Sequence, residues 1–164
     1  MKIVVVSDTH GYFKELQDVI EKEAPFDVLM HCGDVCGHLS MALGDDPAFE
    51  VYAVAGNCDF PGAFPPFEIV EIQSHRILLE HGHRLRVKTG YDWIVAKAQD
   101  NHCDIALYGH THVPESDTVD GVLVFNPGSL TYPRTADERP SYGVIHMNDT
   151  GIIRKEIVYL KTAR

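Results

Sequence analysis

The stretch KIVVVSDTH, residues 2–10, combines an unbroken apolar run with the polar residues that end it. A run such as residues 3–6 is typical of a strand buried on both faces of a parallel sheet. After the run ends, Asp8 and His10 stand two residues apart on the predicted turn. In open α/β sheets, ligands bind beyond the carboxyl ends of parallel strands. The stretch therefore predicts an α/β fold and a ligand site at its end.

Further short motifs repeat this arrangement of polar residues after an apolar run. They are Gly33-Asp34, Gly56-Asn57, His81-Gly82-His83 and Gly109-His110-Thr111-His112. Carboxylate, amide and imidazole groups form a mixed oxygen and nitrogen ligand set, which suits Mn²⁺, Zn²⁺, Fe²⁺ or Ni²⁺ better than Mg²⁺ or Ca²⁺. Two dications about 3.5 to 4 Å apart need a shared anionic ligand. We therefore expect two adjacent divalent metal ions, with Mn²⁺ favoured and Asp34 as the bridging carboxylate.

The remaining apolar patterns predict a single layer of alternating strands and helices, followed by a strand-rich tail of antiparallel strands. Strands are predicted over residues 2–7, 27–31, 49–55, 67–72, 75–81, 105–108, 115–119, 121–126, 141–147 and 152–159. Helices are predicted over residues 12–23, 38–43 and 90–101, the first with Tyr12, Phe13, Leu16, Val19 and Ile20 on one face. No repeat or linker divides the chain, so we expect a single α/β domain over residues 1–164.

The charge balance and the apolar runs exclude several classes of protein. The chain has a formal net charge of -10, whereas proteins that bind long nucleic acids usually carry a basic face. No apolar run approaches the roughly 20 residues of a membrane span, and a strand that begins at Lys2 does not resemble a signal peptide. We expect a cytoplasmic protein that binds neither membranes nor long nucleic acids.

The cysteine content agrees with a reducing compartment, because Cys32, Cys36, Cys58 and Cys103 lack the density of a secreted disulfide scaffold. Cys32 and Cys36 could form half of a structural zinc site. A second Cys/His pair at matching spacing is missing from the sequence. Two small residues near a strand end are therefore the alternative interpretation.

The ordered motifs DTH, GD, GN, HGH and GHTH resemble those of calcineurin-like metallophosphoesterases over essentially the full length. The form GNCD at residues 56–59 and the segment FNPGS at residues 125–129 resemble the compact bacterial YfcE-type phosphodiesterases most. The resemblance implies an α+β sandwich of two packed, mixed β-sheets flanked by helices. A dinuclear metal site is implied at the carboxyl-terminal ends of strands, and a homodimer is suggested by the resemblance alone.

The resemblance also implies a ligand assignment and a reaction. The first metal is assigned Asp8, His10 and His112, the second is assigned Asn57, His81 and His110, and Asp34 is shared. His83 is the alternative to His81, because it lies on the same turn. The implied reaction is hydrolysis of a small phosphoester, a diester before a monoester, in which a hydroxide that bridges the metals attacks phosphorus.

Cys58 departs from many relatives, in which a His after the ligand Asn protonates the leaving oxygen. A thiol with an ordinary pKa of about 8.5 is a weaker general acid at neutral pH, so we expect substrates with acidic leaving groups. Asp59 is expected near the leaving group or behind the ligands. The candidates for substrate contact are His38, Arg134 and Arg139, with solvated side chains as the alternative. Surface or core positions are expected for His31, His75, His102 and His146.

Two alternative functions remain open. A eukaryotic retromer subunit with this type of fold is a protein-interaction scaffold that has lost part of the ligand set, so the fold alone does not establish catalysis. Every expected ligand residue is present here, which favours an enzyme. The second alternative is a nuclease or a cyclic-nucleotide phosphodiesterase. The acidic charge argues against long polymers but leaves short and cyclic nucleotides open.

Overall fold

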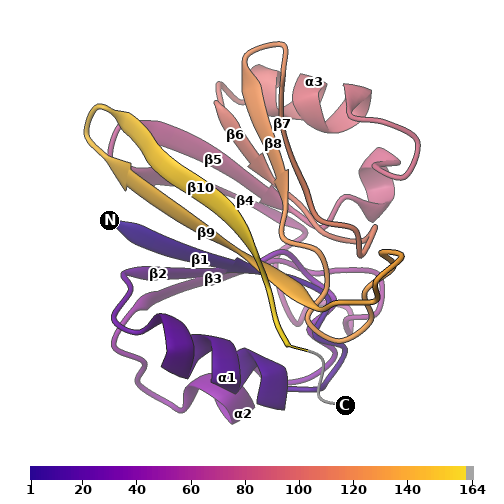
Figure 1. Cartoon of the computed structure of the whole chain (residues 1–164). Helices are drawn as coiled ribbons and strands as arrows, with labels where there is room; N and C mark the ends of the chain where they lie inside the picture. The colour runs from indigo at the N-terminus through magenta and orange to yellow at the C-terminus, as the bar shows by residue number, and fades with distance from the viewer. Residues whose placement is uncertain (162–164) are drawn as a thin grey trace.

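The computed structural model describes residues 1–161 and contains two five-stranded β-sheets that pack face to face (Figure 1). The first sheet has the order β10-β9-β1-β2-β3, formed by Gly151–Tyr159, Ser141–Asn148, Lys2–Val6, Val28–His31 and Glu50–Ala53. The second has the order β4-β5-β6-β8-β7, formed by Phe67–Ile72, His75–Glu80, Ile105–Leu107, Val122–Asn126 and Glu115–Val119. Strands β1, β2 and β3 run parallel to one another, as do β5, β6 and β8. The expected sandwich of two mixed sheets is thus confirmed.

The central strands are apolar on both faces, which is why their sequences are continuous apolar runs. In β1, Ile3 and Val5 belong to the core between the sheets, whereas Val4 and Val6 pack against the helical layer. In β8, Phe125 faces the shared core and Val124 faces the opposite side. Because their side chains alternate between two apolar layers, the central strands bury both of their faces.

Helices cover the outer face of each sheet (Figure 1). Helices α1 (Lys14–Glu23) and α2 (Ser40–Leu43) lie on the first sheet, and α3 (Asp92–Asp100) lies on the second. The prediction that Tyr12 shares the buried face of the first helix is wrong. The helix begins only at Lys14, and Tyr12 is 56% exposed. Within residues 1–161, no helix has both the length and the apolar character needed to cross a membrane.

The division of strands between two layers differs from the single alternating layer that the apolar pattern predicts. Strands β5 and β6 belong to the second sheet, and β8 pairs in parallel with β6 instead of forming only antiparallel pairs. The proline-containing connection of residues 54–66 leads the chain from β3 to the second sheet. The structure also adds a short 3₁₀ helix, η1 (His83–Leu85). The other predicted boundaries agree with the structure to about two residues, the usual uncertainty of strand and helix ends.

The two parallel sets of strands end at one edge of the sandwich. In the first sheet, Asp8 and Asp34 follow the ends of β1 and β2. In the second, His81 follows β5. Nε2 of His81 lies 3.4 Å from Oδ2 of Asp34, so residues from both sheets meet at this edge.

Candidate metal centre

The Asp8-Thr9-His10 turn is held in place by the loop that follows β2. The backbone N–H of Asp8 donates to the carbonyl oxygen of Gly33 at 3.0 Å, and that of His10 donates to the carbonyl oxygen of Asp34 at 2.9 Å. These hydrogen bonds extend the contact between β1 and β2 beyond the ends of the strands. They fix Asp8 and Asp34 beside each other.

Four of the predicted ligands form one compact group. The ligand atoms of Asp8, His10, Asp34 and His112 all lie within 4.8 Å of one another. Nε2 of His112 is 3.1 Å from Oδ1 of Asp8. Nε2 of His10 is 3.8 Å from Oδ1 of Asp8 and 3.8 Å from Oδ2 of Asp34. Oxygen and nitrogen donors from both sheets thus surround one small volume.

The other three predicted ligands form a second group that also contacts Asp34. Besides its contact with Asp34, Nε2 of His81 lies 3.2 Å from Oδ1 of Asn57. The ring centroid of His110 is 5.1 Å from that of His81, and the backbone N–H of His110 donates to Oδ2 of Asp8 at 3.2 Å. Oδ2 of Asp34 is therefore within 4 Å of an imidazole from each group.

Hydrogen bonds to backbone leave Nε2 of two imidazoles without a proton when the rings are neutral. Nδ1 of His112 lies 2.6 Å from the carbonyl oxygen of Tyr132, and Nδ1 of His81 lies 2.8 Å from that of Cys32. A carbonyl oxygen only accepts hydrogen bonds, so Nδ1 donates and Nε2 of each neutral ring carries a lone pair. Histidines that bind metals donate their other ring N–H in the same way.

These lone pairs face other hydrogen-bond acceptors. Nε2 of His112 faces Asp8, and Nε2 of His81 faces Asn57 and Asp34. Oδ1 of Asp8 is buried and accepts no hydrogen bond from any residue between 1 and 161. In the neutral rings these acceptors face one another without a proton between them, and either a proton or a metal cation makes the arrangement favourable. The donor set therefore fits a metal centre.

Burial and charge favour the protonation states that bind cations. Burial alone would raise the pKa of Asp34, but the hydrogen bond and the charge of His81 outweigh burial and hold this pKa far below its usual range. Burial lowers the pKa of His110 to about 4, and the nearby His81 adds to the effect. Burial also lowers the pKa of His10, although Asp34 and Asp8 oppose it. Anionic carboxylates and neutral imidazoles are the metal-binding forms of these groups.

His81 differs from these imidazoles in the direction of its shift. Burial favours its neutral form, but the hydrogen bond with Asp34 and the charge of Asp8 outweigh burial and raise its pKa. The carboxylates thus stabilise positive charge at the position of Nε2. A proton or a metal ion supplies that charge.

Backbone conformation directs the side chains of the site inward. Six residues of the site have positive φ, between 47° and 66°: Asp8, His10, Asp34, Cys36, His110 and His112. This left-handed conformation costs residues with a side chain roughly 1 to 2 kcal/mol each and occurs where the surrounding structure enforces it. Glycine is required next to them: a Cβ on Gly56 would lie 2.1 Å from Oδ1 of Asp34, and one on Gly109 would lie 2.0 Å from Oγ of Ser7.

The segment FNPGS supports the site in a way that sequence reasoning missed. Nδ2 of Asn126 donates to the carbonyl oxygen of Gly109 at 2.9 Å and to Oγ1 of Thr111 at 3.0 Å. Oγ of Ser129 donates to the carbonyl oxygen of Asp8 at 3.0 Å. The segment fixes the loops that carry the ligands. Its polar residues also follow an apolar run, which is the signal that could have identified them.

The histidines outside the motifs lie in the core or near the surface. His31 is buried behind the Asp8-Thr9-His10 turn, with Nε2 3.1 Å from Oγ1 of Thr9, and burial lowers its pKa to about 4. His75 contacts Asp104, and His102 is exposed. His83, the alternative to His81, has its ring centroid 5.4 Å from that of His81. Among the described residues, His83 has no contact with a carboxylate within 4 Å.

Cys58 is exposed and lies next to the proposed ligands. Its backbone N–H donates to Oδ1 of Asp34 at 2.8 Å, and Nδ2 of Asn57 donates to its Sγ at 3.2 Å. Burial and the negative charge of Asp34 raise the pKa of the Cys58 thiol. The group is therefore protonated at neutral pH, and its role as a proton donor stays a prediction.

Asp59 joins two loops behind the site. Its carboxylate accepts the backbone N–H groups of Cys36 at 2.7 Å and of Gly56 at 2.8 Å. Both oxygens are thus used to hold backbone. Cys32 lies in the core between the sheets and, in the described chain, joins no group of metal-binding side chains. It fits the interpretation of a small residue near a strand end.

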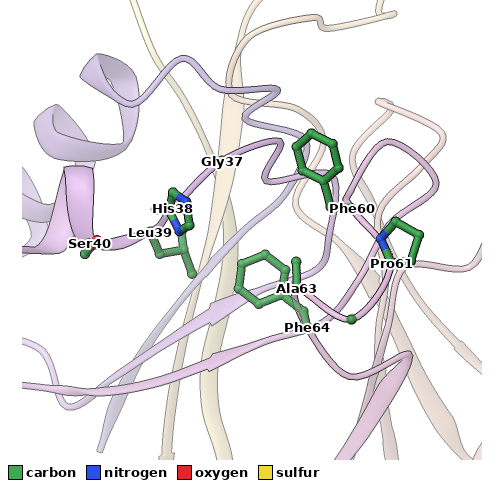
Figure 2. Close-up of a pocket in the computed structure, with 9 residues that line it drawn as sticks. Gly37, His38, Leu39, Ser40, Phe60, Pro61, Ala63 and Phe64 are labelled. Atoms are coloured by element: carbon green, nitrogen blue, oxygen red, sulfur yellow. The ribbon is translucent and has the colours of Figure 1, made fainter.

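A hollow of about 600 Å³ lies between residues 37–40 and residues 60–64, two segments that follow the GD and GN motifs (Figure 2). Its lining is mostly apolar, and the exposed His38 contributes to its wall (Figure 2). A neighbouring hollow of about 540 Å³ shares residues of the 60–64 segment and extends to Asn57 and His83. An apolar surface therefore borders the second group of predicted ligands.

The two arginines of the 128–140 loop have different surroundings. The backbone N–H of Arg134 donates to the carbonyl oxygen of His112 at 3.1 Å, and its side chain is exposed. Arg139 is paired with Asp137 at 3.8 Å and stacks on the ring of Tyr159 at 4.7 Å. Substrate contact by His38 or Arg134 stays a prediction, whereas Arg139 already has partners.

Comparison with known proteins agrees with the motifs. Residues 1–150 match the model of the calcineurin-like phosphoesterase superfamily domain. The chain is 35% identical to the probable metallophosphoesterase YsnB of Bacillus subtilis over 157 residues, which are 94% of this chain and 89% of that protein. It is 31% identical to the phosphodiesterase YfcE of Escherichia coli, over 93% of this chain and 96% of that protein.

Solved structures share the fold. A predicted phosphoesterase from Streptococcus pneumoniae superposes with a TM-score of 0.78 at 25% identity, over 97% of each chain. A Vps29 from Entamoeba histolytica in complex with zinc superposes with a TM-score of 0.78 at 22% identity, over 98% of each chain. The second likeness concerns the fold alone.

Proposed function

Because the chain belongs to the calcineurin-like phosphoesterase superfamily, we propose that it hydrolyses phosphoesters, diesters before monoesters, at a dinuclear metal centre. The proposed ligands are Asp8, His10 and His112 for one cation and Asn57, His81 and His110 for the other. Asp34 is proposed to bind both. The preference for diesters is carried over from YfcE, whose name is that of a phosphodiesterase.

The observation that carries the proposal is a set of oxygen and nitrogen ligand atoms that face one another and need a proton or a cation between them. The Nε2 atoms of His81 and His112 face oxygens, and Oδ1 of Asp8 has no hydrogen-bond donor within residues 1–161. Leaving a buried polar group unpaired costs about 1 to 3 kcal/mol. A network that served only the fold would pair these atoms, whereas cations use all of their lone pairs.

Backbone groups around the site position these ligand atoms in advance. Carbonyl oxygens hold the rings of His81 and His112, and the N–H of Cys58 holds the carboxylate of Asp34. Such outer contacts fix the geometry before substrate binds. When bound, two divalent cations lower the pKa of water, which supplies a nucleophile at neutral pH, and offset negative charge on the phosphoryl oxygens. Exposed Cys58 then stands at the proposed position of a proton donor to the leaving oxygen, a role for which a thiol is a weak acid.

Mn²⁺ is the cation that we favour. Imidazole nitrogens and carboxylate or amide oxygens are mixed in both proposed groups, and this mixture suits Mn²⁺, Zn²⁺, Fe²⁺ or Ni²⁺. Mg²⁺ and Ca²⁺ favour nearly all-oxygen ligand sets.

The proposed substrates are small phosphoesters with an acidic, apolar leaving group. The hollow beside residues 60–64 has the size and apolar lining of a small-molecule site. A net charge of -10 does not attract polyanions over long distances. A scaffold without catalysis is the alternative, and the presence of every predicted ligand beside the others argues against it.

A metal-supplemented substrate screen tests the proposal. Purified protein is stripped with a chelator, loaded with Mn²⁺, Zn²⁺, Ni²⁺ or Mg²⁺, and assayed on aryl phosphodiesters, phosphomonoesters and cyclic nucleotides. We expect hydrolysis of aryl diesters that requires added metal and is fastest with Mn²⁺. Absence of hydrolysis with every metal, in protein that has bound the metal, would favour the scaffold.

Asp34→Asn tests the shared ligand. Replacing the carboxylate removes one charge and one anionic oxygen at the point where two dications meet, so we expect loss of activity and lower metal content. Bound metal and turnover are measured on the same samples. Asp46→Asn is the matched control, because Asp46 is exposed and far along the chain from any motif. Full metal occupancy with near-normal turnover in Asp34→Asn would remove Asp34 from the bridging role.

A further inference from the structure

Cys36, Cys58 and His10 form a cluster of donor atoms beside the proposed ligands. One donor atom of each residue lies within 4.8 Å of the others, and Sγ of Cys36 is 3.7 Å from Nδ1 of His10. Nε2 of the same ring faces Asp8 and Asp34. The imidazole of His10 therefore has one nitrogen toward each cluster.

The distances in this cluster suit a soft cation. A tetrahedral zinc site with Zn–S bonds of about 2.3 Å and Zn–N bonds of about 2.0 Å places its ligand atoms roughly 3.5 to 3.8 Å apart. The separation between Cys36 and His10 already matches this value. Two sulfur ligands and an imidazole select Zn²⁺ and similar thiophilic cations over Mn²⁺. Cys58 is exposed, so a cation can enter from solvent and keep a water as fourth ligand.

Hydrogen bonds hold the backbone of the two cysteines and one of the sulfurs in place before any cation binds. The N–H of Cys36 donates to Asp59 at 2.7 Å, and the N–H of Cys58 donates to Asp34 at 2.8 Å. Nδ2 of Asn57 donates to Sγ of Cys58 at 3.2 Å, and such a contact stabilises a thiolate that binds metal. The cluster is thus tied to both loops and has a polar contact to sulfur.

We propose that Cys36, Cys58 and His10 bind a thiophilic divalent cation of the Zn²⁺ type, at a third site beside the two of the proposed function. Binding releases the two thiol protons to solvent, and no electron is transferred. As a neutral ring, His10 has a single lone pair, so it serves this cation through Nδ1 or a catalytic cation through Nε2. Occupation of the third site therefore weakens Mn²⁺ binding. The competition with Mn²⁺ for His10 rests on the proposed function, whereas the binding of a cation by the two cysteines does not.

The test is a titration of the whole chain with Cd²⁺ as the thiophilic probe. The protein is first loaded with Mn²⁺, and a phosphine reductant keeps the thiols reduced. The near-ultraviolet charge-transfer band between sulfur and cadmium reports thiolate binding. In the wild type we expect a band that saturates at one equivalent of Cd²⁺ per chain. The variant with both Cys36→Ser and Cys58→Ser is expected to lose the band, and circular dichroism confirms its folding. Cys103→Ala is the matched control, because Cys103 is a free, buried cysteine near α3, and it is expected to keep the band.

Electron paramagnetic resonance of released Mn²⁺ tests the competition in the same titration. We expect Mn²⁺ release to follow the growth of the band in the wild type and to require more Cd²⁺ in the double variant. A wild type without a band, or a double variant that keeps it, overturns the thiol site. A band that grows while Mn²⁺ stays bound overturns the competition for His10. A band in a protein that never bound Mn²⁺ supports the thiol site and contradicts the choice of Mn²⁺ in the proposed function.

Discussion

Left-handed backbone at Asp8, Asp34 and His112 turns three side chains into one volume at the end of the strands. Each such residue costs roughly 1 to 2 kcal/mol, and the protein stabilises the conformation with hydrogen bonds to the turn backbone, such as that from Ser129 to Asp8. At the scale of single residues, backbone strain is thus concentrated where the donor atoms meet. Strain of this kind is typical of sites where geometry matters more than stability.

Cys58→His tests whether protonation of the leaving oxygen limits the proposed reaction. If the thiol fails to protonate the leaving oxygen, an imidazole should accelerate substrates with basic leaving groups most and those that release stable phenolates least. A positioned general acid accelerates a reaction by about 10²- to 10⁴-fold. We expect an acceleration at or below the lower value, because contacts that would orient the new imidazole are absent. Rates over a series of aryl phosphoesters give the dependence on leaving-group pKa.

Cys58→Ala is the matched control for this substitution, since it removes the thiol and adds no acid. We expect the rates of wild type and Cys58→Ala to depend steeply on the pKa of the leaving group. The rate of Cys58→His should depend on it less steeply. Equal slopes in all three proteins, with metal still bound, would contradict the idea that leaving-group protonation is limiting.

Gly56→Ala tests the close approach of the loops after β2 and β3. The added Cβ would lie 2.1 Å from Oδ1 and 2.4 Å from the backbone nitrogen of Asp34, so the loops must separate. We expect a loss of about 1 to 3 kcal/mol in the free energy of unfolding from overpacking, together with lower metal content. Gly44→Ala is the control: Gly44 has φ +72° and open space around it, so its substitution should reduce stability and leave metal content unchanged. Equal metal content in both variants would contradict the argument.

At the scale of elements, the sequence predicts the ends of strands better than their partners. Apolar runs predict β1, β2 and β3 because both faces of each strand are covered, and the polar motifs directly after them lie together in the structure. The supporting role of Asn126 and the approach of Cys36 to Cys58 depend on loop conformation and on residues distant in sequence. The apolar pattern carries no information on either. The transfer of the chain to a second sheet after β3 depends on pairing that is likewise non-local.

Glu23 at the end of α1 fastens this helix to the first sheet. Its carboxylate forms an ion pair with Lys2 of β1 at 2.9 Å and accepts a hydrogen bond from the hydroxyl of Tyr142 in β9. Burial alone would raise the pKa of Glu23, but the contacts with Tyr142 and Lys2 outweigh burial and lower it below 4.5. A lowered carboxyl pKa contributes stability that is present above the unfolded value and lost as pH falls through the folded value.

Glu23→Gln should therefore reduce the free energy of unfolding at pH 7 by about 1 kcal/mol, the typical net value of one hydrogen bond. The difference from wild type should shrink as pH falls below 4.5. Urea unfolding of chelator-treated protein at pH 7 and at pH 3.5 measures both effects. Glu21→Gln, an exposed position on the same helix, should have little effect at either pH. A difference between Glu23→Gln and wild type that does not depend on pH would contradict the ionic role of Glu23.

At the scale of the whole molecule, the candidate metal centre joins the two sheets at one edge. Asp8 and Asp34 come from the first sheet, whereas His81 and His112 come from the second. The sheets share an apolar core, but at this edge their contacts are made by carboxylates and imidazoles, which are the groups that we propose bind the cations. Bound metal should therefore stabilise the packing of one sheet on the other as well as the reaction.

The last prediction is a thermal one: Mn²⁺ should raise the melting temperature, and a chelator should lower it. A ligand that binds only the folded state stabilises by RT ln(1 + [L]/Kd), about 2.7 kcal/mol at a hundredfold excess over Kd. For a chain of this length, 1 kcal/mol shifts the melting temperature by about 2 to 4 °C, so one occupied site should shift it by roughly 5 to 10 °C. Asp34→Asn should show a smaller shift and Asp46→Asn the full one. If verified removal of metal leaves the wild-type melting temperature unchanged, the edge of the sandwich does not depend on cations, and the scaffold becomes the better interpretation.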